Sequence, residues 1–191
     1  MEAYYGSAWG PVYAIGAIWG VWILSWMMAA VWTGRTAARP ALGSQFLYRF
    51  VVFAGTISLF NPDLSSSLWT LPPALGWVMV GLTAAGFAFC WWARLYLGRL
   101  WSASVTRKED HHVVDTGPYA LVRHPIYTGI LVASLATAVE RGTVTALVGL
   151  GLITLGYWMK ARLEESFLRG ELGAESYDAY ARRTGMLLPF L

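Results

Sequence analysis

Long uncharged stretches alternate with short polar segments along this chain of 191 residues. Asp, Glu, Lys and Arg are all absent from four stretches: between Glu2 and Arg35, between Asp63 and Arg94, between Arg123 and Glu140, and between Arg141 and Lys160. A helix needs roughly 20 mostly apolar residues to cross a bilayer. The pattern therefore predicts an all-α, polytopic membrane protein.

We expect five spanning helices, at about residues 9–32, 46–60, 72–100, 125–139 and 143–161. Pro72 and Pro73 suit the first turn of the third helix, where a missing N–H does no harm, and its amphipathic end, from Arg94 to Trp101, is expected at the membrane interface. Gly16 and Gly20 form a small-xxx-small pair that favours close helix contact and leaves a dimer open. The intervening segments, including 102–120, are expected to be loops, and the last thirty residues a short soluble helix and tail.

Composition supports a membrane protein, because 57% of the residues are hydrophobic and 13% are charged, against about a quarter charged in soluble domains. A single cysteine, Cys90, excludes a disulfide framework or a thiolate metal site. The net charge of +3 indicates basic loops facing the cytoplasm, not nucleic-acid binding.

Loop charge also predicts the orientation of the chain. Of fourteen Lys and Arg residues, five spans leave Arg141 alone on one side and all the others on the opposite side. Basic loops face the cytoplasm, so we expect a multi-pass protein of the inner or plasma membrane, with its N-terminus outside and its C-terminus cytoplasmic.

The most informative polar segment is 117–129, which carries Arg123, His124 and Pro125 at the start of the fourth predicted helix. A helix N-terminus combines unpaired N–H groups with a positive dipole end. With Arg123 beside it, this end is predicted to bind a carboxylate or a phosphate. The alternative is a positive membrane anchor with a helix cap.

A short connector between the last two spans should bring Arg123 and His124 close to Glu164 and Glu165. Lys160 and Glu164 are also spaced to pair along one helix face. The alternative is a solvated helix end. Adjacent histidines such as His111 and His112 make a poor chelating pair, so we expect no metal site, and the eleven tryptophans are assigned to packing or to the membrane interface.

These residues together resemble a known family. The match covers roughly residues 94–191 and includes Gly117-Pro118-Tyr119, Arg123-His124-Pro125-Ile126-Tyr127, Glu164-Glu165, Tyr177, Tyr180 and Leu188-Pro189-Phe190. The segment resembles the isoprenylcysteine carboxyl methyltransferases and the related phospholipid methyltransferases. The chain would then be a single domain, 1–191, with three N-terminal spans in 1–100 and a cofactor-binding catalytic half in 101–191.

The resemblance implies an integral membrane enzyme that uses S-adenosylmethionine and has a cytoplasmic cofactor pocket formed by the last two spans and the C-terminal segment. It places at the cofactor Gly117, Pro118, Tyr119, His124, Pro125, Tyr127, Glu164 and Glu165. Arg123 and one of the two glutamates, here taken to be Glu164, would be the catalytic residues nearest the transferred methyl group.

The acceptor stays open, because Ala120-Leu121 and Thr184-Gly185 depart from the family pattern. A lipophilic acceptor, first an isoprenylcysteine-like carboxylate, is expected; a phospholipid amine or a small thiol is the alternative. More remote alternatives are an NADPH-dependent membrane reductase and a non-enzymatic membrane protein. Membrane lipids are expected partners, and the sequence does not indicate an oligomeric state.

Overall fold

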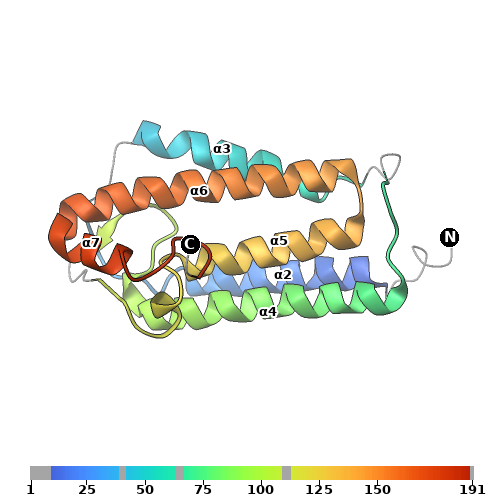
Figure 1. The fold of residues 1–191 in the computed structure, drawn as a ribbon, viewed down its shortest axis with the longest axis horizontal. Helices are drawn as coiled ribbons and strands as arrows, with labels where there is room; N and C mark the ends of the chain where they lie inside the picture. Colours follow the sequence, from blue (N-terminus) through green and yellow to red (C-terminus); the bar gives the residue numbers. More distant parts are fainter. Residues whose placement is uncertain (1–9, 39–41, 63–66, 109–112, 190–191) are drawn as a thin grey trace.

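The computed structural model describes residues 10–38, 42–62, 67–108 and 113–189. Five long helices run side by side along its longest axis (Figure 1). They are α2 (Pro11–Ala29), α3 (Leu42–Leu59), α4 (Pro73–Leu97), α5 (Pro125–Arg141) and α6 (Val144–Leu172). Helix α3 packs along α6, and α4 packs along both α5 and α2. The prediction of an all-α, polytopic membrane protein is confirmed.

By length and composition, three helices of the described residues can cross a membrane: Pro11–Ala29, Pro73–Leu100 and Val144–Glu171. Helices α3 and α5 are shorter, with 18 and 17 residues. All five predicted helices are therefore present, and three of them have the length and hydropathy of a full span. No membrane orientation follows from this arrangement by itself.

Short elements gather at the end of the bundle that carries α7 (Figure 1). They are the 3₁₀ helices η1 (Gly98–Leu100) and η2 (Gly117–Ala120), helix α7 (Ala174–Ala181), and strands β1 (Thr36–Ala38) and β2 (Arg107–Lys108). The two strands pair antiparallel, with Thr36 opposite Lys108. This pairing ties the connection between α2 and α3 to the predicted loop 102–120.

Proline and glycine mark the ends of the helices, as the sequence predicts. Helices α2, α4 and α5 each have proline in the first turn, where its missing N–H removes no helical hydrogen bond. Helix α5 ends at Gly142, which has a left-handed backbone with φ 60° that glycine adopts without strain. Thr143 then caps α6 by accepting a hydrogen bond from the Ala146 N–H.

The end of the last long helix was predicted wrongly. We expected it to stop near Ala161, with Glu164 and Glu165 beyond it. Instead α6 runs unbroken for 29 residues to Leu172 and ends at Gly173, whose φ is 95°. Charged residues do not terminate a helix, and neither glycine nor proline interrupts 157–169. Both glutamates therefore project from a continuous helix, which fixes their positions.

A buried arginine holds the ends of two helices together. Arg94 of α4 was expected at the membrane interface, but its side chain is fully buried. It donates to the carbonyls of Ala29 and Trp32, at 2.9 and 2.7 Å, and to that of Gly98 at 2.6 Å. Its guanidinium also lies 4.3 Å from the centre of the Trp101 ring. The Ala29 and Gly98 carbonyls also accept from the N–H groups of Trp32 and Trp101, so the one charge of Arg94 adds a second donor to these two carbonyls and joins the ends of α2 and α4.

Helices α4 and α5 approach closely at a pair of glycines. A Cβ on Gly86 would lie 2.6 Å from the carbonyl oxygen of Gly129, and one on Gly129 would lie 2.6 Å from Cys90 Sγ. The predicted pair Gly16 and Gly20 does not play this role within the chain, since nothing lies within 4 Å of a Cβ built on either.

Replacing Gly129 by alanine is expected to destabilise the protein by about 1–3 kcal/mol, because extra volume in a tight contact forces the helices apart. The matched control is Gly81→Ala on α4, where a new Cβ meets nothing within 4 Å. Thermal unfolding in detergent should show a clear drop for Gly129→Ala and none for Gly81→Ala. Equal stability of the two variants would contradict close packing at this contact.

Candidate functional site

A cavity of about 420 Å³ opens where α2, α4, α5 and α6 meet the residues 101–106 and 113–114 and helix α7. This volume lies within the range of roughly 300–1,000 Å³ that is usual for small-molecule sites. Its lining includes apolar side chains, among them Trp22, Trp26 and Ile130, and polar ones such as His124 and Glu164. The cavity therefore offers both polar and apolar contacts to a ligand.

The first turn of α5 supplies an aromatic pair to the cavity lining. His124 is the N-cap residue and Tyr127 lies three positions on, so the two rings share one face of the helix. The rings are stacked, with centroids 5.1 Å apart and an interplanar angle of 5°. The side chain of His124 makes no capping hydrogen bond, and Pro125, Ile126 and Tyr127 all line the cavity.

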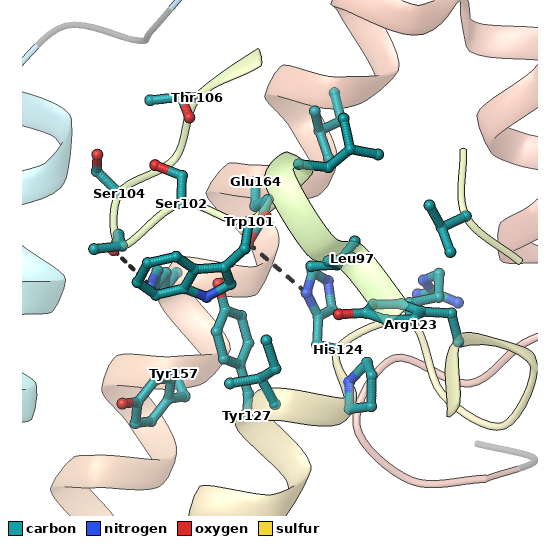
Figure 2. A pocket seen from close by; sticks show the side chains of 18 of the residues that line it. Leu97, Trp101, Ser102, Ser104, Thr106, Arg123, His124, Tyr127, Tyr157 and Glu164 are labelled. Carbon is teal, nitrogen blue, oxygen red and sulfur yellow. Dashed lines mark hydrogen bonds and ion pairs between the residues drawn. The ribbon is translucent and has the colours of Figure 1, made fainter. Parts of the chain in front are cut away.

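Two consecutive glutamates of α6 face this pair. Glu164 Oε2 accepts a hydrogen bond of 2.5 Å from the Tyr127 hydroxyl and lies 3.9 Å from His124 Nδ1. Glu165 Oε1 lies 3.2 Å from His124 Nε2 and accepts a 2.7 Å hydrogen bond from Arg123 Nε. The His124 ring is thus fixed between both carboxylates, and Figure 2 shows Glu164 and His124 facing each other. The predicted proximity of the two segments is present in the structure.

Arg123 holds the C-terminal segment against the start of α5. Its Nη1 donates to the carbonyls of Ala181, at 3.0 Å, and of Thr184. The backbone repeats the connection, because Arg123 N–H donates to Gly185 O at 2.8 Å and His124 N–H donates to Met186 O at 3.1 Å. The Arg123 guanidinium therefore already donates hydrogen bonds to groups of the protein, although Arg123 also lines the cavity.

Buried tyrosines join η2 to α7 beside the cavity. The Tyr180 hydroxyl donates to the carbonyl of Tyr119 at 2.8 Å, and both residues line the cavity. Burial raises the pKa of each phenol above its ordinary value. Both hydroxyls are therefore protonated at neutral pH and act as hydrogen-bond donors.

Replacing Tyr180 by phenylalanine is expected to cost about 1 kcal/mol, the usual contribution of one neutral hydrogen bond. Tyr96→Phe is the control, because Tyr96 is about half exposed. Chemical unfolding in detergent should separate the two variants. A stability of Tyr180→Phe equal to that of the control would show that the bond to Tyr119 contributes nothing.

Three of the predicted cofactor residues stand behind the cavity wall and not on it: Gly117, Pro118 and Glu165. Gly117 has φ 56°, and a Cβ there would collide with the Tyr96 ring, so this position requires glycine to form the turn. Pro118 accepts from the N–H groups of Leu121 and Val122. These residues shape the loop that presents Tyr119, and Glu165 orients His124.

Other residues at the cavity were not identified from the sequence. Trp22, Trp26 and Trp101 were assigned to packing or the interface, yet all three line the cavity. Ser102, Ser104 and Thr106 follow Trp101 and lie along its rim (Figure 2). The polar run after the third span was the available signal, but nothing in its spacing indicates that it folds back over the bundle.

Two further expectations have different outcomes. Lys160 and Glu164 do not form an ion pair: Lys160 Nζ donates to the carbonyl of Ala103 at 3.1 Å, while Glu164 accepts a hydrogen bond from Tyr127.

His111 and His112 lie outside the described residues. Within the described part of the chain, no group of three or more His, Cys, Asp or Glu side chains is arranged to hold a metal ion.

Comparison with known proteins places this geometry in context. A sequence profile of the isoprenylcysteine carboxyl methyltransferase family matches residues 79–169. The cobalt-zinc-cadmium resistance protein CzcN of Cupriavidus metallidurans is 32% identical over 146 residues, which are 74% of this chain and 61% of that relative. The chain therefore spans less than two thirds of the length of this relative.

Two eukaryotic relatives are named as methyltransferases. Protein-S-isoprenylcysteine O-methyltransferase B of Arabidopsis thaliana is 24% identical over 164 residues, covering 81% of each chain. Protein-S-isoprenylcysteine O-methyltransferase of Schizosaccharomyces pombe is 29% identical over 86 residues, or 44% of this chain and 36% of that protein. The profile match includes α5, most of α6 and the three side chains that interact with the His124 ring, those of Tyr127, Glu164 and Glu165.

Proposed function

We propose that the protein is an integral membrane methyltransferase that uses S-adenosylmethionine, a proposal supported by the match of residues 79–169 to the isoprenylcysteine carboxyl methyltransferase family. The observation that carries the proposal is the mixed lining of the cavity, which combines the polar side chains of His124, Tyr127 and Glu164 with several tryptophans. Such a cavity suits a polar methyl donor beside a lipophilic acceptor.

The polar side chains of the cavity fit the charges of S-adenosylmethionine. We infer that the start of α5 receives the methionine carboxylate, because its N-cap side chain makes no capping bond and a helix N-terminus attracts anions. Glu164 projects from the opposite wall and would hold the ribose hydroxyls or face the cationic sulfonium. Tyr119, Pro125 and Tyr127 line the same compartment, while Gly117, Pro118 and Glu165 support it from behind.

Two buried polar atoms also favour a ligand here. Trp22 Nε1 and Thr106 Oγ1 are buried without a hydrogen-bond partner among the described residues, and both residues line the cavity. Buried donors and acceptors are normally paired. A bound donor or acceptor molecule would supply the missing partners.

The bound cofactor would supply an electrophilic methyl group, and the protein's contribution would be alignment of the acceptor in line with it. Arg123 stays protonated and cannot act as a base. Held by Glu165 and two carbonyls, its charge would orient an anionic acceptor at the cavity wall. A carboxylate acceptor needs no base, whereas an amine or thiol would need one, for which Glu164 or His124 is placed.

An isoprenylcysteine-like carboxylate is the acceptor we propose first, because the wall formed by Trp22, Trp26 and Ile130 matches a long apolar group. A lipophilic acceptor would enter from the bilayer between helices. The charge asymmetry of the loops supports a cytoplasmic position for the cavity, with the C-terminus on the same side.

Methyl transfer from labelled S-adenosylmethionine to three acceptor classes in detergent tests the proposal: an S-prenylated cysteine, a phosphatidylethanolamine and a short-chain thiol. We expect a labelled methyl ester on the prenylcysteine. Arg123→Ala should slow the transfer about tenfold or more through loss of an ordered charged contact. Transfer to none of the three, by protein that binds the cofactor, would contradict the proposed acceptor range.

A further inference from the structure

A second pocket, a groove, runs between α3 and α6. This groove of about 320 Å³ is lined by Tyr48, Arg49, Val52, Phe53, Thr56, Ala103, Tyr157 and Lys160. Its floor is formed by two helices that pack along each other. The proposed methyl transfer uses no residue of α3, so it does not account for the α3 side chains that line the groove.

Two cations converge at one end of the groove. The Arg49 guanidinium and Lys160 Nζ lie 5.9 and 5.8 Å from the centre of the Tyr48 ring. Arg49 donates to Gln45 Oε1 at 3.0 Å and to the Tyr48 hydroxyl at 3.4 Å, and Lys160 donates to the Ala103 carbonyl. All these partners are neutral.

Neither cation is joined to a carboxylate by an ion pair among the described residues. Glu164, one helical turn from Lys160, acts on it electrostatically from beyond ion-pair distance and accepts a hydrogen bond of 2.5 Å from Tyr127. The one carboxylate leaves a net positive charge at this end of the groove. Two like charges that share an apolar groove repel each other and lose hydration, so an anion is the complementary ligand.

The other end of the groove is apolar and open. Val52, Phe53 and Thr56 continue along α3 from Arg49, and the Phe53 side chain is 64% exposed. The Thr56 hydroxyl is turned back onto its own helix, donating to the Val52 carbonyl at 2.9 Å. This wall therefore presents hydrocarbon to its surroundings over little more than one helical turn.

Both cations mark the same level of the bundle. Arg49 comes just before the uncharged residues 50–60 of α3, and Lys160 comes just after the uncharged residues 143–159 of α6. The helices run in opposite directions, since Ser58 Oγ donates to Thr145 O near the far end. The charges thus lie where an apolar segment ends, which is the level of lipid headgroups.

We propose that this groove binds one anionic phospholipid. The headgroup phosphate lies between Arg49 and Lys160, and an acyl chain follows Val52, Phe53 and Thr56. Basic pockets between membrane helices recognise phosphate headgroups in this way. Because Lys160 and Tyr157 line both the groove and the larger cavity, the bound lipid forms part of the wall beside the catalytic compartment.

Native mass spectrometry of delipidated protein in detergent tests the proposal. Phosphatidylglycerol and phosphatidylcholine with identical chains are titrated against the wild type, Arg49→Gln, Arg49→Lys and Arg162→Gln. Arg162 is the matched control, because it lies two residues from Lys160 on the same helix and is exposed. We expect one phosphatidylglycerol to bind about tenfold more tightly than phosphatidylcholine, as expected when a charged hydrogen bond is gained.

The preference should disappear in Arg49→Gln and persist in Arg49→Lys and Arg162→Gln. Persistence in Arg49→Gln, or equal loss in Arg162→Gln, would overturn the site in favour of general surface attraction. In a further measurement, inorganic phosphate is added at millimolar concentration to the protein with bound lipid. Displacement of the lipid would mean that a free anion, and not a lipid, is the ligand. The measurement does not depend on methyl transfer, so it stands or fails separately from the proposed function.

Discussion

Replacing Glu164 by glutamine is expected to reduce methyl transfer about 10- to 100-fold, because a hydrogen bond to a charged group contributes about 1.5–3 kcal/mol. The carboxylate is fixed by the Tyr127 hydroxyl at 2.5 Å and lies beside His124. Glutamine keeps the shape but removes the negative charge that would hold the cationic donor. We expect the loss mainly in affinity for S-adenosylmethionine, measured as a raised KM for the cofactor.

Glu175→Gln on α7 is the matched control, because it removes one exposed carboxylate from a residue outside the cavity lining. Its kinetics should equal those of the wild type. Glu164→Gln with unchanged kcat and an unchanged KM for the cofactor would remove Glu164 from the proposed site. A fall in the thermal stability of Glu164→Gln without a change in KM would assign the residue a structural role.

Replacing Arg94 by methionine is expected to destabilise the fold by about 3 kcal/mol or more, because a hydrogen bond from a charged group contributes about 1.5–3 kcal/mol and three are lost at once. The Trp32 carbonyl loses its donor, whereas those of Ala29 and Gly98 keep the N–H groups of Trp32 and Trp101. Arg94→Lys should recover part of the loss, since an ammonium cannot reproduce the planar fork of the guanidinium.

Arg99→Met, five residues further on, is the control for this change, because the Arg99 side chain is exposed. Thermal unfolding of the three variants in detergent gives the comparison. If Arg94→Met unfolded at the temperature of Arg99→Met, the buried arginine would not be what joins the ends of α2 and α4.

Much of the fold was predictable because its signals are local. Uncharged stretches located four of the five long helices, α2, α4, α5 and α6, and Pro125 marked the first residue of α5. The length of α6 was missed because charges after Met159 suggested a membrane boundary, which does not end a helix. The burial of Arg94 was missed for a related reason: sequence shows a charge at a helix end but not the carbonyls that receive it.

The proximity of the two polar segments was predictable, whereas most contacts of Arg123 were not. A tight connector between α5 and α6 correctly brought Arg123 and His124 to Glu164 and Glu165. What sequence could not show is that Arg123 binds the carbonyls of Ala181 and Thr184, because that contact depends on how the C-terminal segment folds back. The position of Trp22 and Trp26 in the cavity lining likewise depends on how α2 packs against α4.

Cofactor binding is the central requirement of the proposed function. Isothermal titration calorimetry of purified protein with S-adenosylmethionine, on the wild type, Glu164→Gln and Glu175→Gln, tests it most directly. We predict one saturable site in the wild type and in Glu175→Gln, with affinity about 10- to 100-fold weaker in Glu164→Gln. No heat of binding by folded wild-type protein at millimolar cofactor would contradict the methyltransferase assignment.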